Sequence, residues 1–141
     1  MIRVEHTVQI SCSPEEVFER LTDVARVPEW QTSAVEMRAS GSLAQGSRIF
    51  EKRRFMGREV DNDFEVVAFD PPRRLTLRSL GGPVKLTIDH ELAAVDGGTR
   101  LTVVASGKPG GVMKLAGPMI ERTAREEIRG DFARLKQLLE T

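Results

Sequence analysis

His90 is the side chain best placed by its sequence context to take part in chemistry inside the protein. The segment 84–95 alternates between two faces, and one of them is apolar except for the histidine: Val84, Leu86, Ile88, His90 and Leu92. Every second residue of a strand points to the same side of its sheet, so the pattern predicts that His90 faces the core. A buried imidazole needs a hydrogen-bond partner, which is either a neighbouring protein group or a ligand.

Asn62, Asp131 and Glu121 are the other polar candidates. Asn62 shares a predicted strand face with Phe64, Asp131 interrupts the apolar stripe of the last helix, and Glu121 lies near the edge of that stripe. Asn62 either lies near solvent at a strand end or faces the core. Asp131 and Glu121 either both reach the rim of the stripe and are solvated, or one of them points its carboxylate into the space between helix and sheet. With His90, a carboxyl group and an amide could polarise a carbonyl and move a proton, as an intramolecular aldol cyclisation or dehydration requires.

Other kinds of site find little support in the sequence. The two histidines, His6 and His90, have no ligand-like spacing to a carboxylate, and the single cysteine, Cys12, excludes both an intramolecular disulfide and a cysteine metal cluster. No glycine-rich phosphate-binding motif stands between a strand and a helix. We therefore predict no metal and no cofactor.

The predicted helix Pro118–Glu140 is the longest element available to position these residues. Its apolar residues recur at helical spacing and form one stripe: Ala124, Ile128, Phe132, Leu135, Leu138 and Leu139. A helix of this length with such a stripe needs a long apolar surface to pack on. The remainder of the chain is predicted to supply that surface as a sheet.

The chain before this helix is predicted to be rich in strands. Ile2–Ile10 alternates as a half-buried strand, Ser13-Pro14-Glu15-Glu16 is typical of a helix start, and Pro28 ends that helix or begins a second short one that carries Trp30. Six further strands are expected at Val35–Ala39, Gly46–Phe55, Arg58–Phe69, Arg73–Leu80, Val84–Val95 and Thr99–Ser106. Turns are expected at Met56-Gly57, Gly81-Gly82-Pro83 and Asp96-Gly97-Gly98. Sequential strands joined by tight turns predict an α+β fold with a seven-stranded antiparallel sheet.

Length and charge narrow the function classes. The 141 residues predict one domain, 1–141, and the 21 basic residues balance the 21 acidic ones, which argues against a protein held mainly by nucleic-acid phosphates. No apolar run has the length of a membrane span, and the N-terminus lacks an apolar signal region. We therefore expect a cytoplasmic protein, monomeric or homodimeric, with no membrane span.

Several stretches of the sequence resemble the START-like or SRPBCC superfamily, in its polyketide cyclase/dehydrase and lipid-transport branch. The resemblance rests on Ser13–Phe18, Val27–Trp30, Phe69–Leu75, Asp96–Thr102 and Phe132–Glu140, and it extends over nearly the whole chain. It implies the helix-grip fold, a curved sheet wrapped around the long C-terminal helix, with two short helices after the first strand. These stretches are turns, caps and packing positions, so they indicate a fold more than a function.

The resemblance also implies a cavity between the sheet and the last helix that holds an apolar or amphipathic small molecule. From strand and helix phase, we predict that its lining includes Trp30, Phe50, Asn62, Phe64, Leu77, Ile88, His90, Ala124, Ile128, Asp131 and Phe132. Two further positions have an alternative: the strand 46–55 could instead face inward with Ile49, and Trp30 could pack beneath its short helix.

Three functions fit these expectations. The first is a protein that binds a small hydrophobic or amphipathic ligand, such as a lipid or a polyketide-like molecule, with His90 and Asn62 orienting its polar end. The second is a polyketide cyclase or dehydratase that uses acid/base chemistry in the same cavity, although the sequence has no tyrosine. The third is a protein-interaction module that docks through Lys52-Arg53-Arg54 and Arg58.

Overall fold

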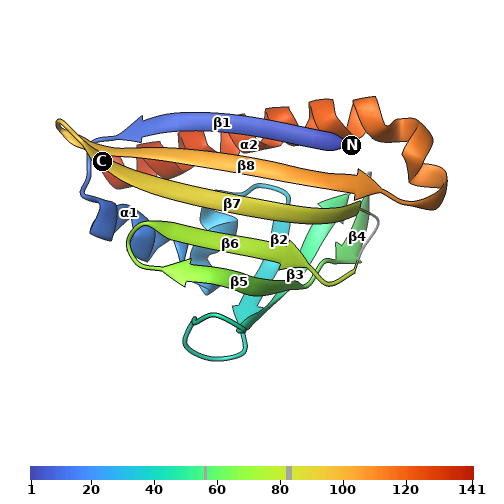
Figure 1. Cartoon of the computed structure of the whole chain (residues 1–141), viewed down its shortest axis with the longest axis horizontal. Coiled ribbons are helices and arrows are strands. Elements are labelled where there is room, and N and C mark those ends of the chain that lie inside the picture. Colours follow the sequence, from blue (N-terminus) through green and yellow to red (C-terminus); the bar gives the residue numbers. More distant parts are fainter. Residues whose placement is uncertain (56, 82–83) are drawn as a thin grey trace.

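The computed structural model describes residues 1–55, 57–81 and 84–141 and confirms the predicted helix-grip fold. Figure 1 shows a curved antiparallel sheet with one long helix running along it. The strands are β1 (Ile2–Ile10), β2 (Ala34–Ala39), β3 (Arg48–Phe55), β4 (Arg58–Asp61), β5 (Phe64–Asp70), β6 (Arg74–Ser79), β7 (Val84–Val95) and β8 (Gly98–Pro109). The helices are α1 (Pro14–Leu21), η1 (Val24–Glu29), η2 (Gly111–Ala116) and α2 (Gly117–Glu140). Of the predicted turns, two include Met56 and Gly82-Pro83, which lie outside the described residues.

The sheet is antiparallel, with neighbouring strands in the order β1-β8-β7-β6-β5-β3-β2. Seven strands form this path, as predicted, and β4 is added beside β3. The prediction of one long strand over Arg58–Phe69 is wrong, because the chain is interrupted between β4 and β5. There the Asn62 N–H donates to the Glu51 carbonyl (2.9 Å), and the Leu80 N–H donates to the Asp63 carbonyl (2.8 Å). Asn and Asp are disfavoured inside strands, and these two positions form the break.

The first helix begins where its sequence predicts. Ser13 is the N-cap of α1, its hydroxyl accepts from the Glu16 N–H (3.2 Å), and Pro14 occupies the first turn. The short helix η1 follows with Pro28 inside it, and Trp30 is its C-cap. The buried Trp30 ring then packs against Phe132 of α2, with ring centroids 5.1 Å apart. This contact fixes the segment after η1 against the long helix.

Helix α2 runs lengthwise along the sheet, next to β1 (Figure 1). Two separate apolar clusters hold it. Phe132 and Leu135, toward its C-terminal end, belong to the main core. Ile120, near its N-terminal end, packs with Ile2 and Val84 in a smaller cluster. The helix is therefore anchored at two places, and its middle part spans the distance between them. No helix in the described part of the chain has the length and hydropathy needed to cross a bilayer.

We predict that the C-terminal anchor of α2 carries much of the stability of the fold. Leu135 is 0% exposed and Leu138, on the same helix, is 42% exposed. Leu135→Ala should lower the free energy of unfolding by about 2–5 kcal/mol because it leaves a cavity in the core. Leu138→Ala should change it by only about 0.5 kcal/mol. Urea denaturation measures both, and equal losses for the two variants would contradict this packing.

Candidate ligand pocket

A pocket of about 550 Å³ lies between the sheet and the middle of α2. Its walls are mostly apolar and come from α2 and from all eight strands of the described part of the chain. Ile2, Val84 and Ile120, the smaller cluster that anchors α2, bound it on one side, and Phe132 of the main core bounds it on another. The pocket is thus the space that the two anchored ends of α2 leave beneath its middle.

Nine of the eleven residues predicted from the sequence line this pocket. They are Asn62, Phe64, Leu77, Ile88, His90, Ala124, Ile128, Asp131 and Phe132. Their strand and helix phases were the basis of the prediction, and the structure has the same phases. Whether any of them binds a ligand remains a prediction.

Phe50 lies on the opposite face of β3, so its predicted position is wrong. Ile49 and Glu51 are buried on the inner face, and the Arg38 guanidinium stacks over the Phe50 ring at 4.5 Å from its centroid. The alternative phase, with Ile49 inside, is therefore the one adopted. A strand as charged as β3 gives no clear apolar alternation, because its inner face itself carries charged side chains.

Trp30 does not line the pocket either. It is buried against Phe132, which does reach the pocket wall. The backbone carbonyl of Trp30 accepts a hydrogen bond from Nε of Arg134 (3.0 Å). Trp30 therefore supports the pocket from behind, in the packing role that was its alternative interpretation.

His90 is buried and its ring lies 6.1 Å from that of Phe132, measured between centroids. Nδ1 is 3.0 Å from the Leu75 carbonyl on β6. Since a carbonyl only accepts, Nδ1 carries the proton, and Nε2 of the neutral ring is an acceptor. Burial lowers the pKa of His90, against the opposing effects of the Leu75 carbonyl and Asp89. His90 thus adds an uncharged polar group to the pocket wall.

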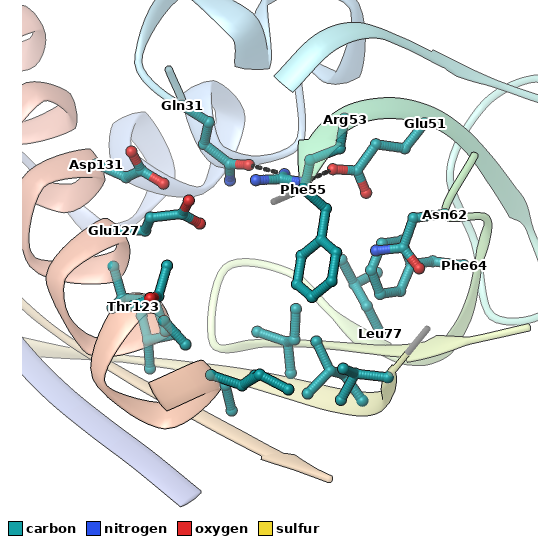
Figure 2. A pocket seen from close by; sticks show the side chains of 18 of the residues that line it. Gln31, Glu51, Arg53, Phe55, Asn62, Phe64, Leu77, Thr123, Glu127 and Asp131 are labelled. Carbon is teal, nitrogen blue, oxygen red and sulfur yellow. Dashed lines mark hydrogen bonds and ion pairs between the residues drawn. The ribbon is translucent and has the colours of Figure 1, made fainter. Parts of the chain in front are cut away.

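Asn62 lies on the side of the pocket away from α2. Its Oδ1 atom is buried and has no hydrogen-bond partner. Figure 2 shows Asn62 and Asp131 on opposite sides of the pocket. The sequence suggested that His90, Asn62 and Asp131 could act together on one point of the cavity. Because Asn62 and Asp131 lie on opposite sides, these three side chains do not meet at one point. Glu121, the alternative carboxylate, is not part of the pocket lining and accepts a hydrogen bond from the Arg3 backbone N–H (2.9 Å).

A group of charged and amide side chains forms one side of the pocket, which we call the polar wall: Gln31, Glu51, Arg53, Glu127 and Asp131 (Figure 2). Glu51 is only 3% exposed, and Nε of Arg53 donates to its carboxylate. The Arg53 Nη1 group donates to the Ser33 hydroxyl and Nη2 to the Gln31 amide oxygen, both at 2.5 Å. Three partners therefore hold the Arg53 guanidinium against the sheet side of the wall.

The helix side of the polar wall carries two carboxyl groups. Glu127 and Asp131 are one helical turn apart on α2, and Figure 2 shows both on the side of the pocket toward Gln31 and Arg53. Asp131 is 5% exposed and accepts from Nη2 of Arg134 at 2.5 Å. Glu127 is near the Ser33 hydroxyl, which acts to lower the pKa of its carboxyl group. Two acids are therefore held side by side in a partly buried place.

Burial raises the pKa of all three carboxyl groups of the polar wall. For Glu51, burial outweighs the lowering effect of Arg53. For Glu127, burial and the negative charge of Asp131 outweigh Arg53 and Ser33. For Asp131, burial outweighs its bonds with Arg134. Carboxyl groups whose pKa is raised in a cleft are candidates for proton transfer or ligand recognition.

Most of the polar wall was missed from the sequence. Arg53 was assigned to an exposed basic run, Lys52-Arg53-Arg54, whereas the structure turns Arg53 inward and leaves Lys52 and Arg54 exposed. Strict alternation along β3 was the available signal, since an inward Ile49 requires an inward Glu51 and Arg53. Glu127 is four residues before Asp131, and residues four apart lie on the same face of a helix. This spacing indicated that Glu127 faces the pocket together with Asp131.

Within residues 1–55, 57–81 and 84–141, no three His, Cys, Asp or Glu side chains are grouped so that they could hold a metal ion together.

Comparison with known proteins agrees with this architecture. Residues 1–140 match the family described as polyketide cyclase / dehydrase and lipid transport. A START superfamily protein from Mycobacterium smegmatis is similar in structure, with a TM-score of 0.84 and 17% identity over 98% of this chain and 97% of that one. The Zhui aromatase/cyclase from Streptomyces sp. R1128 has a TM-score of 0.83 and 18% identity over 98% of this chain and 93% of that one. No curated protein matches the sequence significantly.

The raised pKa of Glu127 leads to a prediction about stability and pH. A carboxyl group whose pKa is raised by folding favours the folded state only while it is protonated. Its contribution is therefore complete below about pH 4.5, the ordinary glutamate value, and is lost as the pH rises through the raised value. Glu127→Gln should match the parent in acid and exceed its free energy of unfolding at neutral and higher pH.

Glu126→Gln is the matched control, since Glu126 is exposed on the same helix. Urea denaturation across the pH range measures both variants. A gain for Glu127→Gln that does not depend on pH, or an equal gain for Glu126→Gln, would contradict this electrostatic account.

Proposed function

The chain belongs to the polyketide cyclase/dehydrase and lipid transport family, and we propose that it is a single-domain protein that binds a small amphipathic molecule in the pocket between sheet and helix. The observation that carries the proposal is the pocket itself, about 550 Å³ in volume, with apolar walls and one polar wall. Ligand sites for small molecules commonly have this volume and this combination of apolar surface with a few polar groups.

In this proposal the apolar part of the ligand lies against β6, β7, β8 and α2. Ile88, Leu77 and Ile128 are examples of the side chains available to it. The polar group of the ligand lies at the polar wall, where Glu127 and Asp131 are in reach of the cavity. His90 and Asn62 supply further polar contacts away from that wall.

Blocking the pocket should abolish binding. Ala124 lines the pocket on α2, so Ala124→Phe places a ring in the space where the ligand is expected. We predict at least about a tenfold loss of affinity for the neutral hydrophobic probe N-phenylnaphthylamine, measured by fluorescence titration, because about 1.4 kcal/mol of lost contact corresponds to tenfold. Ala133→Phe, on an exposed position of the same helix, is the control. Equal binding by both variants, or no binding by the parent, would refute the proposal.

A second candidate function is catalysis of cyclisation and dehydration in the same pocket. The observation that favours it is the pair Glu127 and Asp131, whose raised pKa values and shared position suit a general base and a general acid. One carboxylate would take a proton from the carbon beside a carbonyl, and the protonated partner would give one to the oxygen of the carbonyl that is attacked. Arg53 would add positive charge near the developing oxyanion.

This candidate predicts turnover of a linear diketone whose carbonyls are separated by three methylenes. The parent protein should release a cyclic enone and one water, detected by mass spectrometry. Glu127→Gln and Asp131→Asn should each lower the rate by about 100-fold or more, the ordinary contribution of a general acid or base. Glu126→Gln should keep the parent rate. Binding of the diketone with no turnover above that of free solution would eliminate catalysis and leave the binding function standing.

A further inference from the structure

The charges around the pocket are unequal, and this inequality bears on the ligand. Among the described residues that line the pocket, three are acidic and one is basic: Glu51, Glu127, Asp131 and Arg53. The whole chain, in contrast, has equal numbers of acidic and basic residues. The excess of negative charge is therefore a local property of the polar wall.

Arg53, the one cationic side chain among the described lining residues, already has three hydrogen-bond partners. Arg53 donates through Nε to Glu51, through Nη1 to Ser33 and through Nη2 to Gln31. Glu51 is 3% exposed, so moving the guanidinium away to meet an anionic ligand would leave a buried carboxylate without its counter-charge. Breaking a buried pair in this way is strongly destabilising. Arg53 is thus a fixed part of the wall and not a free anion receptor.

Among the described lining residues, helix α2 contributes no cation. Arg134 bonds Asp131, the Trp30 carbonyl and the Thr32 hydroxyl, and it is not part of the pocket lining. Glu127 and Asp131 instead present acceptor oxygens beside the cavity (Figure 2). An anionic group placed here would meet two carboxyl groups in a site of low dielectric, where like charges repel strongly.

We propose that the pocket accepts ligands whose polar group is uncharged or positively charged and donates hydrogen bonds, such as a hydroxyl, phenol or ammonium group, and that it rejects carboxylates and phosphates. This inference rests on the proposed binding function and narrows its ligand class. The donor group of the ligand bonds the Glu127 and Asp131 oxygens while its apolar part fills the rest of the cavity. An ammonium group gains charge attraction in addition to the hydrogen bonds.

Three molecules with the same alkyl chain separate the charge of the ligand from its hydrophobicity: dodecylamine, dodecanol and dodecanoate. Each competes with N-phenylnaphthylamine at about pH 8, where the amine is protonated and the acid ionised, at concentrations below those that form micelles. We expect dodecylamine and dodecanol to displace the probe, and dodecanoate to need at least about tenfold higher concentration.

The double variant Glu127→Gln/Asp131→Asn tests the cause of this preference. Because the double variant lacks two carboxylates, the ratio of its affinities for dodecylamine and dodecanoate should fall by at least about tenfold. Its affinity for dodecanol should change little. Glu126→Gln, which removes an exposed carboxylate from the same helix, should preserve the parent preference. Circular dichroism checks that each variant is folded.

The outcomes distinguish this inference from the function on which it rests. If dodecanoate competes as well as dodecylamine in the parent, or if the double variant keeps the parent preference, the charge selection is wrong while ligand binding stands. If neither the probe nor any of the three alkyl molecules binds, both the binding function and the charge selection are wrong.

Discussion

The pocket depends on how helix α2 is anchored. Phe132 and Leu135 fix its C-terminal half in the main core, and Ile120 fixes its start against Ile2 and Val84. Between these anchors, small or polar residues such as Ala124 and Glu127 face a sheet that curves away from the helix, so the space is not filled. A straight helix of about 36 Å, at about 1.5 Å per residue, cannot follow a curved sheet along its whole length. The cavity is a geometric result of that mismatch.

The buried pair Glu51–Arg53 shapes what the cavity can accept. Burying two charges is unfavourable unless hydrogen bonds satisfy them, and the segment 31–33 supplies these through Gln31 and Ser33. That segment is itself held to α2 by the packing of Trp30 on Phe132. Core packing therefore determines the position of the polar groups. Burial of Glu127 and Asp131 is unfavourable for the stability of the fold. Such locally destabilising positions are typical of functional sites and not of the packed core.

The fold was largely predictable from the sequence, whereas the polar wall was not. Alternation in β7 placed His90 correctly, and helical spacing placed Ala124, Ile128 and Asp131, because in both elements the apolar residues mark the inner face. In β3 the inner face carries Glu51 and Arg53, so hydrophobicity gave the wrong phase and Phe50 was placed inside. Two of the three partners of Arg53, Gln31 and Ser33, come from a loop some twenty residues earlier, and only the folded chain brings them together.

A crystal structure of the protein with dodecylamine would test the central claim most directly. The account predicts that the alkyl chain lies between β7 and α2 and that the ammonium group is within hydrogen-bond distance of Glu127 or Asp131. Arg53 should still bond Glu51 in that complex. An alkyl chain bound elsewhere, a pocket closed by its own side chains, or an ammonium group directed away from the polar wall would contradict it.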